Sequence, residues 1–448
     1  MPKRFLATLI LGVLTALPLS AEPVVTTFTL ENGMDAVVIE DHRAPVVTHM
    51  VWYRVGSADE PWGASGIAHF FEHMMFRGSE KYPNGIASQV IAENGGSENA
   101  FTSYDYTAYF QRIASDRLET VMDIESDRMK NLQINDEVTL TERKVILEER
   151  NQRTDSSPQQ LFSEQVRAAL YLNHPYAVPV IGWRHEIAAL STEDLLEFYN
   201  RYYAPDNAIL VVAGAVTPER VRELAETYYG PLQPSGKPPE PRPTEPPQLA
   251  PRRMEMSDHR VRQPYVMRLY LVPSYASGGA SEAAALSVLS EVLGTGISSR
   301  FASSLQLQEK TAISTGAWYS ASARDATGFG LWGVPAPGVD LQTVEDDLDA
   351  VIAEIAANGP TQEELDRVKR TLRAARIFAQ DSQSSQANLY GRTLSVGLSV
   401  EDVDAWPEAV EAVTIQDVQE AAKKHLIMDR SVTGWLTRDE KGERGVTQ

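Results

Sequence analysis

The 448-residue chain is predicted to have an α+β fold of two similar half-domains, each a mainly antiparallel sheet packed with helices. Three observations support this prediction. Segments with the two-residue alternation of a strand are interspersed with segments that have the period of an amphipathic helix. This mixture occurs on both sides of residues 233–251, which are rich in proline and lack an apolar period. The two flanking parts are similar in size, which suggests an internal duplication.

The first part, residues 22–232, begins with two strand patterns around Asn32-Gly33, a turn that is typical of a β-hairpin. The expected strands cover residues 24–30, 36–39, 46–55, 99–102, 107–112 and 208–214. The expected helices cover residues 66–76, 86–92, 116–130, 136–150, 192–203 and 217–229. This part alone therefore contains enough elements for a complete domain.

The proline-rich residues 233–251 are expected to form an extended linker. The second part, residues 252–448, repeats the mixture of strands and long helices. Its expected strands cover residues 266–271, 314–322 and 328–333, and its expected helices cover residues 281–294, 341–357 and 361–378. The two parts share little visible sequence, so the duplication is inferred from the order of elements alone.

Residues 1–21 have the pattern of a signal peptide. Lys3 and Arg4 form a positive start, residues 5–17 are an apolar run, and Ala21 offers a small residue for cleavage. A membrane anchor is the alternative, but the apolar run is short for a membrane span. The sequence therefore predicts an exported protein with no stable membrane anchor, located in the periplasm if the organism has one.

Composition limits the classes of function. The 61 acidic residues outnumber the 41 lysines and arginines, which gives a net charge of −20 and argues against binding to nucleic acid. The chain has no cysteine, so it has no disulfide despite the expected export. A zinc site in this chain must therefore use histidine and carboxylate ligands.

The expected helix at residues 66–76 contains the motif His69-x-x-Glu72-His73. Two histidines four residues apart lie on one face of a helix and can reach one metal ion. Glu72 also points toward that face and can accept a proton from a metal-activated water without being a ligand. The alternative is that both histidines are ordinary residues of an apolar helix.

A third ligand is available on the expected helix at residues 136–150, where Glu142 and Glu149 lie two turns apart on one face. One of them can bind the metal while the other steadies a histidine ligand. Glu148 is a competing candidate, and a solvated acidic helix face is the alternative for the whole group. The expected strand at residues 99–102 could hold an extended peptide along its edge, or could be an ordinary strand of the sheet.

At these residues the chain resembles the pitrilysin, insulinase and mitochondrial-processing-peptidase family of zinc peptidases, in the short form of about 50 kDa. The resemblance rests on the His69 motif, on the two glutamates and on residues 99–102, and it extends over most of residues 25–235. It implies one zinc ion per chain and hydrolysis of unfolded peptides or small proteins. The implied roles are metal ligands for His69, His73 and Glu149, general base for Glu72, support of a ligand for Glu142, and substrate binding for Asn99 and Ala100.

The chain departs from the family pattern in its second half. The resemblance implies an arginine and a tyrosine that stabilise the substrate oxyanion, but Gln308 and Thr315 occupy the matching positions. Arg300, Trp318 and Tyr319 are close in sequence but out of register. We therefore expect a homologous partner subunit to supply this pair in a heterodimer, with a homodimer as the alternative. A scaffold or peptide-binding subunit without catalysis is the competing function.

Overall fold

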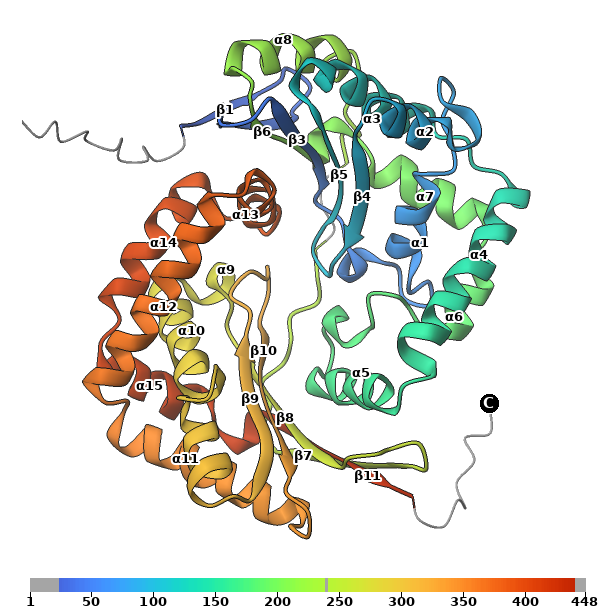
Figure 1. Ribbon diagram of the computed structural model, residues 1–448. Helices are drawn as coiled ribbons and strands as arrows, with labels where there is room; N and C mark the ends of the chain where they lie inside the picture. Colours follow the sequence, from blue (N-terminus) through green and yellow to red (C-terminus); the bar gives the residue numbers. More distant parts are fainter. Residues whose placement is uncertain (1–23, 238–240, 440–448) are drawn as a thin grey trace, which may run out of the picture.

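The computed structural model describes residues 24–237 and 241–439, and the expected signal peptide, residues 1–21, lies outside these ranges. Within the described residues, no helix combines the length and the apolar character that a membrane span requires. The chain folds into two half-domains, drawn in blue to green and in yellow to red in Figure 1. The predicted α+β fold of two similar halves is confirmed.

The first half is built on a six-stranded sheet with the order β1-β2-β6-β3-β5-β4. Only β2 and β6 pair in parallel, and every other neighbouring pair is antiparallel. Strand β6 is central and all of its residues are buried, which agrees with its continuous apolar sequence. The strands are β1 (Val25–Thr29), β2 (Asp35–Glu40), β3 (Val46–Tyr53), β4 (Ser97–Thr102), β5 (Thr107–Ala114) and β6 (Ala208–Gly214). Strand β4 therefore forms one edge of this sheet.

Helices α1, α3, α7 and α8 pack one face of this sheet and enclose the main apolar core of the half. Residues with odd numbers in β3, such as Val47 and Val51, point into this core, while Met50 and Trp52 point to the other face. The helices of the half are α1 (Ile67–Met74), α2 (Ile86–Glu93), α3 (Leu118–Asn131), α4 (Asp136–Arg150), α5 (Pro158–Leu170), α6 (Arg184–Ala189), α7 (Thr192–Tyr202) and α8 (Pro218–Tyr228).

The second half contains a five-stranded sheet with the order β7-β11-β8-β10-β9, in which only β7 and β11 pair in parallel. Helices α10, α11 and α15 contribute to its core. The strands are β7 (Arg252–Asp258), β8 (Tyr265–Val272), β9 (Ala312–Tyr319), β10 (Thr327–Pro335) and β11 (Ser431–Arg438). The helices are α9 (Tyr275–Gly278), α10 (Ala280–Gly294), α11 (Leu341–Asn358), α12 (Gln362–Gln380), α13 (Gln383–Ser395), α14 (Val400–Ala412) and α15 (Ile415–His425).

The two halves share one topology. In chain order, β2 to β6 occupy the same sheet positions as β7 to β11, with a parallel pair at one end and an antiparallel edge strand at the other. The edge strands β4 and β9 are therefore equivalent. This shared topology supports an internal duplication, which residue identity does not reveal.

Each half covers the open sheet face of the other with one helix. Helix α13 packs on β3 and β6 of the first half, and α5 packs on β8 and β11 of the second half (Figure 1). Glycines allow the close approach: a Cβ at Gly391 would lie 2.2 Å from the Trp52 ring, and a Cβ at Gly434 would lie 2.6 Å from Phe162. The two halves are therefore joined through packed cores as well as through the chain.

Arg242, in the chain between the two sheets, also joins the halves. Its guanidinium forms ion pairs with Asp59 and Asp105 of the first half, at 2.9 and 2.5 Å. It forms a third with Asp325 of the second half, at 3.0 Å. Because the Arg242 side chain is only 6% exposed, these pairs are largely protected from solvent.

Strand β9 begins two residues earlier and ends three residues earlier than the expected strand at 314–322. The backbone leaves the sheet after Tyr319, where the carbonyl of Ala321 accepts hydrogen bonds from Tyr275 and Ala323. The position of this strand was therefore predicted correctly, but its ends were not.

Candidate metal centre

Helix α1 is short, and two partly buried carboxylates fix its beginning. Glu60 accepts hydrogen bonds from the backbone amides of Gly66 and Ala68, both at 2.9 Å. Glu186 accepts one from the amide of Ser65 at 2.8 Å. Free amides at a helix N-terminus favour negative charge, so these contacts stabilise the first turn of α1. They hold the helix that carries the histidine motif in a defined position.

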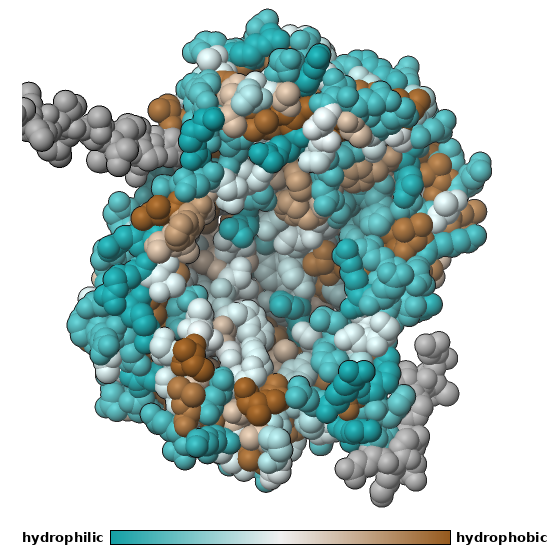
Figure 2. Space-filling view, in the orientation of Figure 1, coloured by the Kyte–Doolittle hydropathy of each residue, from teal (hydrophilic) through white to brown (hydrophobic). Residues whose placement is uncertain are grey.

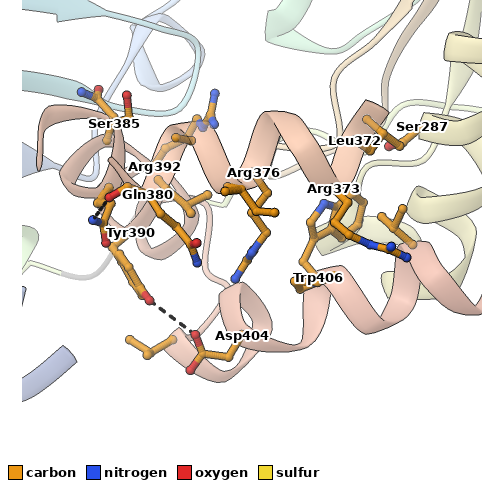
Figure 3. A pocket seen from close by; sticks show the side chains of 18 of the residues that line it. Ser287, Leu372, Arg373, Arg376, Gln380, Ser385, Tyr390, Arg392, Asp404 and Trp406 are labelled. Atoms are coloured by element: carbon orange, nitrogen blue, oxygen red, sulfur yellow. Dashed lines mark hydrogen bonds between the residues drawn. The ribbon is translucent and has the colours of Figure 1, made fainter. Parts of the chain in front are cut away.

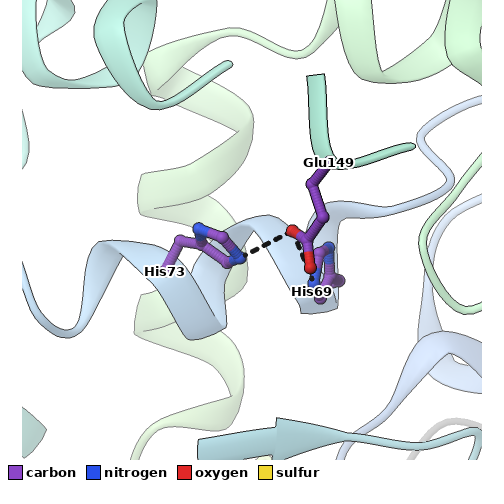
Figure 4. Close-up of side chains that lie close together, drawn as sticks. All are labelled: His69, His73 and Glu149. Atoms are coloured by element: carbon purple, nitrogen blue, oxygen red, sulfur yellow. Dashed lines mark ion pairs between the residues drawn. The ribbon is translucent and has the colours of Figure 1, made fainter. Parts of the chain in front are cut away.

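The two histidines of α1 meet the end of α4 (Figure 4). Oε2 of Glu149 lies 3.6 Å from Nε2 of His69 and 3.2 Å from Nε2 of His73. One ligand atom from each of the three residues lies within 4.8 Å of the others. The structure therefore brings together the three side chains that the sequence analysis proposed as ligands.

This arrangement fits a zinc ion. Ligands about 2.0–2.1 Å from a tetrahedral zinc lie roughly 3.3 Å from one another, and Oε2 of Glu149 lies at a similar distance from each histidine, at 3.2 and 3.6 Å. Oε2 of Glu149 is buried, and it faces the Nε2 atoms of both histidines. Two imidazoles and a carboxylate also form a donor set that catalytic zinc sites use.

Glu142 supports His73 from behind. Its Oε1 lies 2.8 Å from Nδ1 of His73, and its Oε2 accepts from Nε of Arg77 at 2.5 Å. The Glu142 side chain is only 1% exposed, so its orientation is strongly restrained. A carboxylate on Nδ1 directs the free electron pair of Nε2 toward a metal.

The metal-free cluster has unequal histidines. Burial and the neighbouring His73 lower the pKa of His69 to about 4. Burial also disfavours a charge on His73, but Glu142 and Glu149 outweigh it and raise the pKa of His73 to about 9. The contact with His73 in turn lowers the pKa of Glu149. In the absence of metal, His73 is therefore the positively charged imidazolium at neutral pH, with a proton on each ring nitrogen.

Glu72 lies beside this cluster, on the same helix. Its Oε2 accepts a hydrogen bond of 2.6 Å from the hydroxyl of Thr102, which is the last residue of β4. Burial raises the pKa of Glu72, and the bond from Thr102 opposes this effect. Thr102 was not among the predicted site residues, and only the alternation of side chains along β4 could have indicated its contact with Glu72.

The two proposed substrate-binding residues lie in the middle of the edge strand β4. The side-chain oxygen of Asn99 accepts a hydrogen bond of 2.9 Å from the amide of Ala100. Strand β4 pairs only with β5 among the described strands, which leaves its outer edge without a neighbouring strand. This edge can therefore accept an additional strand.

A cavity of about 1400 Å³ lies on the other face of the same sheet. Trp52, Phe101 and Tyr106 line it from the first half, and α12, α13 and α14 line it from the second half. Figure 3 shows the side chains of the second half that line it, and Figure 2 shows the molecule hollowed between the halves. Strand β4 separates the two regions, because Thr102 faces Glu72 while Phe101 faces the cavity.

The second half offers no free arginine and tyrosine at the expected segment. Gln308 ends a helical turn, and the hydroxyl of Thr315 accepts a bond of 2.8 Å from Gln306. Arg300 is engaged by carboxylates of the second half, including Glu364 at 2.5 Å. The hydroxyl of Tyr319 donates to a backbone carbonyl of the same half at 2.7 Å.

Two models of one protein family match the chain. The model described as Insulinase (Peptidase family M16) matches residues 36–183, and the model described as Peptidase M16 inactive domain matches residues 189–372. The chain belongs to peptidase family M16. The family predicted from the sequence is thereby confirmed, and the residues matched by the second model do not include the histidine motif.

Related proteins agree with this assignment along nearly the whole chain. The zinc protease PqqE of Helicobacter pylori is 28% identical over 411 residues, which cover 91% of each chain. The mitochondrial-processing peptidase subunit beta of Lentinula edodes is 25% identical over 414 residues, covering 89% of this chain and 86% of that one. A crystal structure of a protease from Helicobacter pylori superposes with a TM-score of 0.87 at 27% identity, covering 93% of this chain and all of that one. The family M16 relatives are thus proteins named as proteases.

Proposed function

We propose that this protein is an exported zinc metalloendopeptidase that hydrolyses unfolded peptides or small proteins. The observation that carries the proposal is the convergence of one ligand atom each from His69, His73 and Glu149 within 4.8 Å, on a helix that also carries Glu72. The donor set and its separations are compatible with one zinc ion per chain. The names of the M16 relatives support the same reaction class.

The chemistry follows from the position of Glu72. A zinc ion held by the three ligands would act as a Lewis acid on a peptide carbonyl and on a water molecule. Glu72 would accept a proton from a water molecule on Oε1, because Thr102 engages Oε2 at 2.6 Å. A pKa raised by burial makes this carboxylate a stronger base than an exposed one. The same carboxyl can then return the proton to the leaving amine.

The peptide would be held as an additional strand along β4. Asn99 and Ala100 lie at the middle of this edge, and their backbone groups would pair with the substrate. Side chains of a paired strand alternate between the two faces of the sheet. One set would therefore lie on the side of Glu72, and the other set would lie beside Phe101 at the cavity of about 1400 Å³.

We further propose that a homologous subunit completes the active site. The segment that contains Gln308 and Thr315 lacks the arginine and tyrosine that would stabilise an oxyanion, and a partner in a heterodimer would supply them. A homodimer would leave this function unfilled. We assign the mature protein to residues 22–448 in the periplasm, with half-domains at 22–232 and 252–448 joined by the linker 233–251.

The test combines metal analysis with cleavage of a quenched fluorescent peptide library. Wild type is expected to carry about one zinc ion, and Glu72→Gln is expected to keep zinc while losing cleavage, because Glu72 is not a ligand. Glu149→Gln is expected to lose zinc. Glu148→Gln is the matched control on the same helix and should keep zinc, since Glu148 contacts Gln152 rather than the histidines.

The same experiment distinguishes the peptidase from a second candidate function. A scaffold or peptide-binding subunit without catalysis is favoured by the missing arginine and tyrosine. If wild type binds zinc but cleaves no peptide, and if adding a homologous subunit does not restore cleavage, the peptidase proposal is wrong. If the isolated chain is fully active, the requirement for a partner is wrong and the peptidase proposal stands.

A further inference from the structure

The chain directly after Glu149 winds more widely than an α-helix. Asn151–Asp155 form a π-helical turn at the end of α4. Such turns are rare and often occur at functional sites, because they shift the side chains that follow. Here the turn carries Arg153, whose Nη2 lies 2.9 Å from Oε1 of Glu149. The side chain of Arg153 is 71% exposed, so the guanidinium lies at the mouth of the metal cluster.

The two oxygens of Glu149 serve different neighbours. Oε2 faces both histidines, at 3.6 and 3.2 Å, whereas Oε1 faces Arg153. Arg153 therefore does not occupy the place that a metal ion would take. Its guanidinium carries five N–H groups, and its only ion pair among the described residues is with Glu149. The remaining donors are directed to solvent.

Other arginines near the cluster are committed to structural contacts. Arg150 is buried and pairs with Glu164 at 2.9 Å, and Arg77 pairs with the buried Glu142 at 2.5 Å. Arg153 is different, because a single exposed pair four residues apart on a helix contributes little to stability. Turning its guanidinium toward another anion would therefore cost the fold little.

The charge of Arg153 reaches the proposed general base. Burial, the largest influence, raises the pKa of Glu72, and the charge of Arg153 acts in the opposite direction. Arg153 is thus within electrostatic range of the atoms around which a peptide bond would be cleaved. The geometry agrees, because Arg153 contacts one oxygen of Glu149 at 2.9 Å while the other oxygen faces both histidines, so a peptide at the cluster would pass close to this guanidinium.

We propose that Arg153 is a specificity-determining residue that binds an aspartate or glutamate side chain of the peptide, close to the bond that is cleaved. This inference rests on the proposed peptidase function. The planar guanidinium matches a carboxylate and forms charge-assisted hydrogen bonds with it. The net charge of −20 repels acidic peptides at long range, so the preference must come from this local contact.

The experiment measures binding rather than turnover. Labelled peptides that differ only in the position of a single aspartate, and a matching set with lysine, are titrated by fluorescence anisotropy against zinc-loaded Glu72→Gln protein. We expect about tenfold tighter binding of the aspartate peptide at one or two adjacent positions. The preference should shrink as salt is added, because the site is exposed.

Two variants in the same Glu72→Gln background assign the preference to Arg153. Arg153→Glu should abolish or invert the ratio of the two affinities. Arg220→Glu is the control, because it makes the same charge change on α8, where Arg220 is 46% exposed, and should leave the ratio unchanged. If Arg153→Glu fails to retain zinc, Arg153→Gln replaces it, since it removes the positive charge without adding a negative one.

The outcomes distinguish the inference from the proposed function. A preference for aspartate that survives in Arg153→Glu or Arg153→Gln overturns the inference, as does tight peptide binding with no preference at any position. Both results leave the peptidase proposal intact. If the zinc-loaded protein binds none of the peptides, either alone or with a homologous subunit added, the proposed function itself fails and the inference fails with it.

Discussion

The hydroxyl of Thr102 donates a hydrogen bond to Oε2 of Glu72, and the two oxygens lie 2.6 Å apart. Thr102 ends the edge strand β4, and Glu72 lies on α1 between the two histidines. The strand proposed to bind the peptide is therefore also the strand that orients the proposed base. Pairing with β4 would therefore also set the position of the substrate relative to the carboxylate of Glu72.

Thr102→Val is expected to lower kcat by about 10–100-fold, because a hydrogen bond to a carboxylate contributes roughly 1.5–3 kcal/mol and orients its free oxygen. Valine keeps the shape and the strand preference of threonine. Zinc content and KM should change little, and Thr102→Ser should retain most activity because it keeps the hydroxyl. Steady-state kinetics with a single fluorogenic peptide would measure these effects. An unchanged kcat, or an equal loss in Thr102→Ser, would contradict this role.

Zinc binding is expected to release a proton and to strengthen as pH rises. Glu142 and Glu149 overcome burial and raise the pKa of His73 to about 9, so His73 is protonated in metal-free protein at pH 7. A metal must displace this proton, and apparent affinity should therefore rise about tenfold per pH unit until pH reaches about 9. Calorimetric titrations at fixed pH in buffers of different ionisation enthalpy would count the protons released.

Glu142→Gln is the informative partner for that measurement. It removes the charge that helps to hold the proton on His73, so fewer protons should be released at pH 7. It also replaces the charged acceptor at 2.8 Å from Nδ1 with a neutral amide oxygen, and zinc affinity should fall by about 10–100-fold. Equal proton release by wild type and variant would show that Glu142 does not control the protonation of His73.

Arg242→Met is expected to destabilise the protein by about 3–5 kcal/mol, because it leaves the carboxylates of Asp59 and Asp105 buried without their partner. Arg43→Met is the control, since Arg43 also joins the halves, through Asp381 at 2.9 Å, but is 54% exposed. That variant should lose less than about 1 kcal/mol. Guanidinium unfolding monitored by tryptophan fluorescence would compare them, and equal losses would contradict the importance of burial.

Local patterns were sufficient to predict many elements. The predicted ranges 136–150 and 208–214 agree with α4 and β6. For α4 the reason is a clear start, where the side chain of Asn135 accepts from the amide of Val138. For β6 the reason is a continuous apolar run that is buried on both faces. Both signals lie within the segment itself.

Elements that depend on the other half were missed. No element was assigned to α5 or α13, whose apolar faces pack against a sheet formed by distant residues. Strand β7 was also missed, because it alternates charged residues with Met254 and Met256 at a sheet edge. Strand β7 pairs only with β11 among the described strands, and because β11 lies at the far end of this half, no short window records the pairing.

The residues of the candidate site also fall into those that local patterns predicted and those that they did not. Helical spacing placed His69, Glu72 and His73 on one face, and a two-turn spacing related Glu142 to Glu149. Thr102, Arg153 and Arg242 had no such signal, because their partners are set by strand alternation, by a π-helical turn and by the packing of two halves. Contacts between elements therefore supplied what periodicity could not.

Acid is expected to destabilise the first half through His49. This residue is fully buried between Gln111 and the hydroxyl of Tyr229, at 2.7 and 3.0 Å, and burial lowers its pKa to about 4. The folded state keeps His49 neutral, whereas the unfolded chain takes up a proton below pH 6.5. The unfolded state therefore binds more protons between pH 6.5 and 4, and stability falls as pH falls through this window, by up to about 1.4 kcal/mol per pH unit. Unfolding free energies of metal-free wild type and His49→Gln, measured from pH 4.5 to 7, would isolate this contribution. The unfolding free energy of the variant should depend less steeply on pH, by a slope that corresponds to nearly one proton. Parallel curves would show that His49 does not take up a proton on unfolding.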